Sequence, residues 1–92
     1  MVHAIVLITA DPSAVANLAP TLADLEGVRE VYSVAGDEDV VAIVRVPTHE
    51  ELADVVTTRV AKQPGVVRTR TLIAFRSWSE TDLSSEWGVS VE

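Results

Sequence analysis

Two segments of this chain consist of apolar residues only, and they restrict its possible folds more than any other feature. One covers residues 4–8 and the other covers residues 40–44. Both have the length and the β-branched composition of a β-strand. A strand with one face in water alternates apolar and polar residues, whereas these two segments are apolar on both faces. We therefore expect two central strands whose side chains are buried on both sides of a sheet.

The rest of the chain has the pattern of two helices and two more strands. Strand composition is found in four segments in all, residues 3–9, 28–35, 40–46 and 66–75. The first helix is predicted to begin with Asp11 as its N-cap and Pro12 as its first residue. Pro20 lies inside this helix, where a proline costs about 3 kcal/mol, so we expect a kink or a broken first turn. Thr48 and Glu51 have the spacing of a capping box, which opens the second helix.

The resulting order is βαββαβ, which predicts an α+β domain of the ferredoxin-like type. Because crossover connections are right-handed, this order favours a four-stranded antiparallel sheet with both helices on one face. We assign residues 1–76 to one ligand-binding and oligomerisation domain and residues 77–92 to a C-terminal tail with a short helix. A chain of 92 residues has no material for a second layer over the other sheet face. A second copy of the chain is the expected cover.

Composition and charge exclude several classes of protein. Hydrophobic residues make up 48% of the chain, which is more than one small core hides. No apolar stretch approaches the roughly 20 residues of a membrane span, and no secretory signal is visible, so we expect a cytoplasmic protein without membrane contact. Fourteen acidic residues against seven basic ones give a net charge of −7. This charge repels a phosphate backbone, so direct contact with nucleic acid is not expected.

No catalytic residue, metal site or cofactor is predicted. The chain contains no cysteine, no G-x-S-x-G motif and no glycine-rich phosphate loop. His3 begins a strand and His49 lies in the first turn of a helix, so we expect them to be far apart rather than to share a metal. The acidic residues 37–39 lack the ligand spacing of an EF-hand and are interpreted as a solvated hairpin turn. Asp39 is of interest within that turn, because it lies where the third strand begins and can point at a ligand.

Arginine and threonine alternate over residues 68–71, which places Thr69 and Thr71 on one face of the fourth strand and both arginines on the other. Two interpretations remain open. The segment can be an edge strand whose charges prevent aggregation. Alternatively, the two threonine hydroxyls bind a small polar ligand.

Several short motifs in a fixed order resemble one known family. They are V-A-G-D-E-D-V-V-A over residues 34–42, then Gly65-Val66, then Thr69-Arg70-Thr71. Together they resemble the effector-binding and assembly domain, or RAM domain, of the leucine-responsive and asparagine regulators (Lrp/AsnC) of transcription. The tail pattern R-x-W-S-x-x-D-L-x-x-x-W is similar to an aromatic-containing extension of actinobacterial members.

The resemblance implies a ferredoxin-like domain that dimerises through its sheet in a dimeric α/β-barrel-like assembly, with four dimers forming an octamer. It also implies an amino acid or related small effector, bound between dimers. Gly36 would let the hairpin approach the ligand, Asp39 would hold its ammonium, Thr69 and Thr71 would hydrogen-bond it, and Ser33 would lie near the pocket wall. Because this chain begins at the first strand, it resembles stand-alone members without the helix-turn-helix domain. Full-length Lrp/AsnC regulators are then implied partners.

Two alternatives share the same topology. One is a small dimeric α+β barrel enzyme of the monooxygenase or isomerase type, which needs a roomy pocket lined by polar and aromatic side chains. The predicted interior is instead filled with valine, leucine, isoleucine and alanine, so we favour a non-enzymatic module. The other alternative is an ACT-like regulatory module of a metabolic enzyme, which would co-purify with that enzyme.

Overall fold

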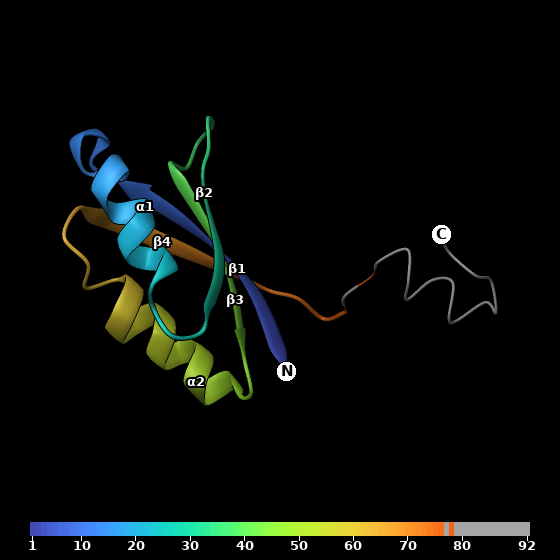
Figure 1. Cartoon of the computed structure of the whole chain (residues 1–92). Coiled ribbons are helices and arrows are strands. Elements are labelled where there is room, and N and C mark those ends of the chain that lie inside the picture. Colours follow the sequence, from blue (N-terminus) through green and yellow to red (C-terminus); the bar gives the residue numbers. More distant parts are fainter. Residues whose placement is uncertain (77, 79–92) are drawn as a thin grey trace, which may run out of the picture.

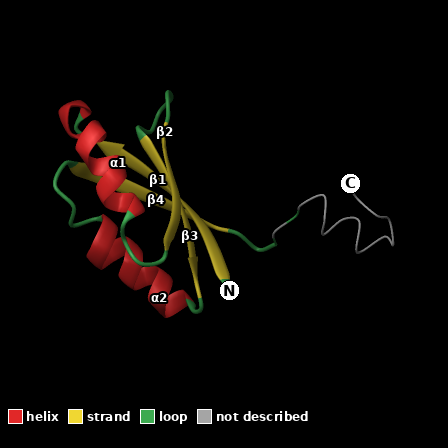
Figure 2. Ribbon diagram, viewed as in Figure 1, coloured by secondary structure: helices red, strands yellow, loops and turns green. Residues whose placement is uncertain are grey.

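The computed structural model describes residues 1–76 and residue 78, so the helix predicted for the tail falls outside the described residues. The elements follow the predicted order: β1 (Val2–Ala10), a 3₁₀ turn η1 (Pro12–Ala14), α1 (Val15–Ala23), β2 (Val28–Ser33), β3 (Val40–Val46), α2 (His49–Asp54), a π-helical segment η2 (Val55–Val60) and β4 (Val66–Ile73). The strands form one sheet of order β2-β3-β1-β4, and every pairing is antiparallel. Figures 1 and 2 show both helices on the same face of this sheet. The ferredoxin-like prediction is confirmed, and β1 and β3 are the two central strands.

The core lies between the sheet and the helices, and every buried residue of the described chain is apolar. Alternate residues of the central strands point into it, namely Ala4, Val6, Ile8 and Ala10 of β1 and Val40, Ala42, Val44 and Val46 of β3. The helices contribute Leu18, Leu22, Leu52, Val55 and Val60. The buried residues that alternate along the strands and those that recur every three to five positions along the helices therefore pack together in one apolar layer.

The first helix begins as its sequence predicts. The Asp11 carboxylate accepts hydrogen bonds from the Ser13 hydroxyl at 2.8 Å and from the Ser13 backbone N–H at 3.0 Å. These two bonds lower the pKa of Asp11, because they stabilise its charged form. The helix starts with the 3₁₀ turn η1, but α1 continues without interruption through Pro20, so the broken turn expected at that proline is not found there. Pro20 and Ala16 are both exposed, so water can reach the Ala16 carbonyl that Pro20 leaves without a donor.

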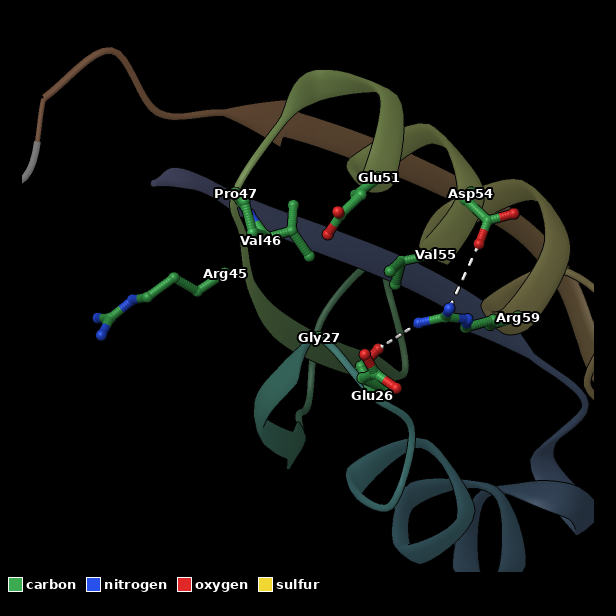
Figure 3. Close-up of a pocket in the computed structure, with 9 residues that line it drawn as sticks. All are labelled: Glu26, Gly27, Arg45, Val46, Pro47, Glu51, Asp54, Val55 and Arg59. Atoms are coloured by element: carbon green, nitrogen blue, oxygen red, sulfur yellow. Dashed lines mark hydrogen bonds and ion pairs between the residues drawn. The ribbon is translucent and has the colours of Figure 1, made fainter.

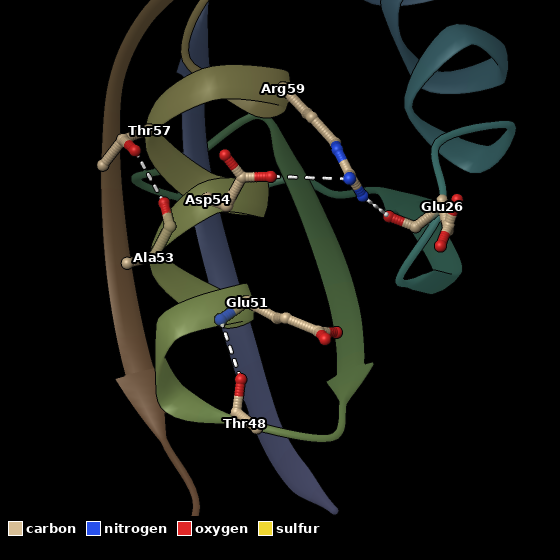
Figure 4. Close-up of polar contacts among 7 residues, drawn as sticks. All are labelled: Glu26, Thr48, Glu51, Ala53, Asp54, Thr57 and Arg59. Atoms are coloured by element: carbon tan, nitrogen blue, oxygen red, sulfur yellow. Dashed lines mark hydrogen bonds and ion pairs between the residues drawn. The ribbon is translucent and has the colours of Figure 1, made fainter.

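The second helix changes its winding along its length. The Thr48 hydroxyl accepts from the Glu51 N–H at 3.1 Å, as predicted, although the return bond of a capping box is not formed in the described chain (Figure 4). From Val55 onward the helix is π-helical. Residues five apart in an α-helix point about 140° away from each other, whereas the wider π turn brings them to one side. Val55 and Val60 are therefore both buried.

The second face of the sheet carries no helix in the described chain, and we call it the open face (Figure 1). Strand register assigns to it the alternate residues Glu30 and Tyr32 of β2, Val41, Ile43 and Arg45 of β3, His3, Ile5, Leu7 and Thr9 of β1, and Arg68, Arg70 and Leu72 of β4. Its centre is apolar and only partly covered, with Ile5 37% and Leu72 47% exposed. The central strands are therefore apolar on both faces, and the burial of the second face beneath another copy stays a prediction. None of the described helices is long and apolar enough to cross a membrane.

Candidate functional site

The hairpin loop between β2 and β3 is attached to the end of β1 by Asp39. The Asp39 N–H donates to the Ile8 carbonyl at 2.9 Å, and its carbonyl accepts from the Val34 N–H at 3.0 Å. Its carboxylate Oδ2 accepts from the Ala10 N–H at 2.9 Å. Ile8 pairs with Val40, which is the first residue of β3. The N–H of Ala10 lies two residues further along β1, where β3 has no backbone acceptor for it. The Asp39 side chain continues the β1–β3 ladder by one more bond.

We predict that Asp39→Ala lowers the free energy of unfolding by about 1–3 kcal/mol, because the N–H of the buried residue Ala10 loses a charged acceptor. Asp37→Ala is the matched control, since it removes an exposed carboxylate from the same loop and should change stability by less than about 0.5 kcal/mol. Urea denaturation followed by circular dichroism measures both values. Equal losses in the two variants would contradict the structural role of Asp39.

The same loop also reaches β4 through an ion pair. Arg70 Nη2 lies 3.4 Å from Glu38 Oε1, and the glutamate side chain is 21% exposed while that of the arginine is 64% exposed. The pair spans β1, because β1 lies between β3 and β4. Beside it is a hollow of about 360 Å³, which we call the arginine hollow, lined by Leu7, Thr9, Glu38, Arg68, Thr69 and Arg70.

Of the predicted ligand-binding residues, Thr69 lines the arginine hollow. Asp39 is next to Glu38 in the chain, and one of its carboxylate oxygens accepts the hydrogen bond from the Ala10 N–H. Thr71 lies opposite Val6 on the helix-facing side of β4 and lines a separate apolar hollow of about 210 Å³ beneath α2 and η2. Ser33 ends β2 and is exposed. Gly36 is exposed in the loop, with no atom near the position of a Cβ. A single chain therefore does not bring these five residues into one hollow.

Sequence reasoning missed the pairing of Glu38 with Arg70. The two residues are 32 positions apart and become neighbours only because the hairpin lies over the end of β1. The opposite charges of the hairpin and of β4 could have indicated this pair, but only after the order of the strands in the sheet was known. The described residues contain no group of three or more histidine, cysteine, aspartate or glutamate side chains that could hold a metal ion.

A larger hollow, of about 480 Å³, lies at the opposite end of β3 (Figure 3). Arg59 closes one side of it: its Nη1 donates to the Glu26 carbonyl at 2.9 Å, and its Nη2 lies 3.4 Å from the Asp54 carboxylate. Figure 4 shows this arginine crossing from η2 to the turn that follows α1. Since Asp54 and Arg59 are five residues apart, the π turn is what allows them to meet. We interpret this hollow as a structural joint, because Arg59 joins η2 to the turn after α1 through the Glu26 carbonyl.

Comparison with known proteins agrees with this architecture. The sequence pattern of the Lrp/AsnC ligand binding domain matches residues 3–83. Among solved structures, the protein TTHA0845 from Thermus thermophilus is 46% identical, with a TM-score of 0.82, and the match covers 87% of this chain and 100% of that one. Among curated proteins, no sequence matches the chain closely enough to count as a relative.

Two longer regulators are also similar. The feast or famine regulatory protein from M. tuberculosis, complexed with L-methionine, is 35% identical with a TM-score of 0.74, covering 87% of this chain and 54% of that one. E. coli AsnC is 19% identical with a TM-score of 0.77, covering 83% and 52%, which shows the fold alone. This chain thus spans about half the length of these two regulators. The family pattern covers most of the chain and the fold agrees with it, so the chain belongs to the Lrp/AsnC ligand-binding domain family.

Proposed function

We propose that this chain is a non-enzymatic regulatory module that binds an amino acid and acts by assembling with copies of itself, without contacting DNA directly. The observation that carries this proposal is the open face. An apolar patch framed by polar residues is the usual form of a protein interface. Here the apolar centre lies on the two middle strands and extends to Leu72 of β4, while Glu30 and the two arginines of β4 lie on the edge strands and Arg45 lies near the end of β3. A second copy that covers this face would bury the exposed part of Ile5, Leu7, Val41, Ile43 and Leu72.

An amino acid is the proposed effector, since a 35% identical relative is complexed with L-methionine. We retain as proposed ligand contacts the residues Ser33, Gly36, Asp39, Thr69 and Thr71. Because one chain does not gather them into a single hollow, the proposal requires neighbouring copies to complete the site. The second oxygen of Asp39 is free of the bond to Ala10 and is available to an ammonium group. Dimers, octamers of four dimers and mixed assemblies with full-length regulators are the proposed states.

The interior favours this proposal over a barrel enzyme. The space between the sheet and the helices is filled by apolar side chains, and no buried residue of the described chain is polar. Catalysis inside that layer would need positioned acids, bases or hydrogen-bond donors. Membership of the Lrp/AsnC ligand-binding family likewise favours this assignment over an ACT-like module.

Sedimentation velocity over a range of protein concentrations, with and without each amino acid, tests the proposed function. We expect a dimer or a larger assembly at micromolar concentration, and a shift in the distribution of species with the amino acid that binds. Such a shift requires that the amino acid bind one assembly more tightly than another. A monomer at all concentrations would overturn the assembly role. A distribution that no amino acid changes would overturn the effector role.

A further inference from the structure

We propose that Phe75 and Arg76, which follow β4, dock on α2 of a second copy of the chain, with the Phe75 ring in the apolar hollow beneath α2 and η2. This inference rests on the proposed function and deepens it, because it names the contact that joins dimers into larger assemblies. The hollow lies on the helix side of the sheet, so it stays accessible when another copy covers the open face.

The end of β4 exposes a cluster of large apolar side chains. Leu72, Ile73 and Trp78 are each about half exposed, and Phe75 is 101% exposed, so its ring contacts nothing in the described part of its own chain. Figure 1 shows the segment after β4 leading away from the sheet and the helices. Apolar residues exposed singly are normal, whereas a cluster of them marks a surface that meets another molecule.

The apolar hollow has the size and the lining that suit such a ring. Leu52, Ala53 and Val56 line it from the helix side and Ile73 lines it from β4, its walls expose almost only apolar atoms, and its volume is about 210 Å³. Pockets for small-molecule ligands usually measure about 300–1,000 Å³ and contain several polar groups that orient the ligand. This hollow is smaller and less polar, so it fits a single apolar side chain better. Phe75 lies outside the hollow of its own chain, and another copy must therefore supply the ring.

The charges beside the ring and beside the hollow are complementary. Arg76 forms no ion pair within the described residues, and its contact with the Trp78 ring, 6.0 Å away, uses no N–H donor. A second hollow, which we call the acidic hollow, shares two residues with the apolar hollow and is lined by Thr48, Glu50, Glu51, Ala53, Asp54 and Thr57. In the described chain neither Glu50 nor Glu51 has an ion-pair partner. Because consecutive Cα atoms are about 3.8 Å apart, a copy that inserts Phe75 brings Arg76 to these carboxylates.

The contact is too small to hold two isolated chains together. A buried phenylalanine removes about 150–250 Å² of surface from water, whereas a stable interface buries at least about 1,200 Å² in total. It therefore acts between chains that are already paired, since a dimer offers two such contacts at once. A protruding segment that fits a hollow elsewhere on the same molecule makes a head-to-tail contact, which closes into a ring if the rotation allows. A ring of dimers is the assembly that this contact favours.

Sedimentation velocity of Phe75→Ser tests the contact. We expect the wild type to form species larger than a dimer. The variant should stop at the dimer, with the concentration needed for larger species raised at least about thirtyfold. Val67→Ser is the matched control, since it removes another largely exposed apolar residue of β4, and it should assemble like the wild type. The fold of Phe75→Ser should be unchanged, which circular dichroism checks, because the ring makes no contact in the described part of its own chain.

Cross-linking tests whether the two parts of the contact meet. The chain contains no cysteine, so single cysteines can be introduced without interference. Phe75→Cys chains are mixed with Ala53→Cys chains, treated with a short thiol-to-thiol cross-linker and analysed by mass spectrometry. Each chain carries one thiol, so every cross-link joins two chains. We expect the mixed product to exceed that of a control mixture in which Asn17→Cys, an exposed position on α1, replaces Ala53→Cys.

Charge reversal tests the contribution of Arg76. Arg76→Glu and Glu50→Lys should each weaken the larger assembly, and the double variant should recover most of it, because the opposite charges are restored in exchanged positions. Arg29→Glu is the control, since it changes the net charge by the same amount at an exposed position of β2 and should leave the assembly unchanged. A double variant that recovers nothing would remove Arg76 from the contact.

Three results would overturn the proposal. The first is a Phe75→Ser chain that assembles like the wild type. The second is a folded Phe75→Ser chain that is monomeric, which would assign Phe75 to the dimer interface instead. The third is cross-linking between positions 75 and 53 that does not exceed the control. A wild type that stops at the dimer would also overturn this inference while leaving the proposed function in place, whereas a wild type that stays monomeric would overturn both.

Discussion

Ile43→Lys is expected to convert the assembled protein to monomers, raising the dissociation constant of the dimer by at least about a hundredfold. Ile43 lies on β3 in the middle of the open face and pairs with Ile5 of β1 on one side. A second copy covering this face would bury a lysine without a partner, and an unpaired buried charge is strongly unfavourable. In the monomer the new side chain can reach water, so the fold itself should be little affected. Sedimentation velocity measures the dissociation constant.

Val67→Lys is the matched control for this prediction. It introduces the same charge at an apolar residue that is 70% exposed, but Val67 lies at the irregularity where the register between β1 and β4 shifts, outside the residues that the register assigns to the open face. Its assembly should equal that of the wild type. If both variants dissociate to the same extent, or if Ile43→Lys assembles normally, the open face is not the interface.

Gly65→Ala is expected to lower the free energy of unfolding by about 2–4 kcal/mol. Gly65 has φ +93°, a backbone conformation that residues with a side chain rarely adopt. A Cβ at this position would also overlap the Cβ of Ala14 in η1. Relief of that overlap would require η1 to move, although the Gly65 carbonyl accepts from the Asp11 N–H at 2.9 Å at the start of the same turn. The strain and the overlap therefore add.

Gly36→Ala provides the comparison for that measurement. Gly36 does not have a positive φ, and nothing lies within 4 Å of the position that its Cβ would take. The substitution should change stability by no more than about 0.5 kcal/mol. Urea denaturation of the two variants separates the effect of a methyl group from the effect of its position. A loss for Gly65→Ala as small as that for Gly36→Ala would show that η1 yields without cost.

Most of the fold could be predicted because it depends on local chemistry. Alternation in β1 and β3, the Asp11 cap and the Thr48 cap each involve residues close in sequence. The π winding of η2 could not be predicted in this way. Val56 and Val60 have the four-residue spacing of an ordinary α-helix, and only the burial of both Val55 and Val60 against the sheet reveals the five-residue spacing.

The candidate site was harder to predict than the fold, because its contacts join distant parts of the chain. Asp39 was selected as a ligand residue. Its carboxylate accepts a hydrogen bond from Ala10, which is 29 positions away in the sequence, so the sequence around Asp39 gave no sign of this contact. Strand alternation correctly put Thr69 and Thr71 on one face of β4. However, the two threonines border different hollows: Thr71 lies beneath α2 and η2, whereas Thr69 borders the arginine hollow, whose other strand residues point to the open face. Alternation determines which way a side chain points, and only the packing of other elements determines what surrounds it.

The attachment of the hairpin to β1 has a consequence for how binding and assembly can influence each other. One strand carries Ile5 and Leu7 on the open face and also the Ile8 and Ala10 backbone groups that hold Asp39. The loop is thus not an independent flap but moves with the strand. If assembly through the open face changes the twist of β1, the loop that is hydrogen-bonded to this strand is displaced with it. If the proposed effector repositions the loop, its effect on the free energy of assembly equals the effect of assembly on the free energy of its binding.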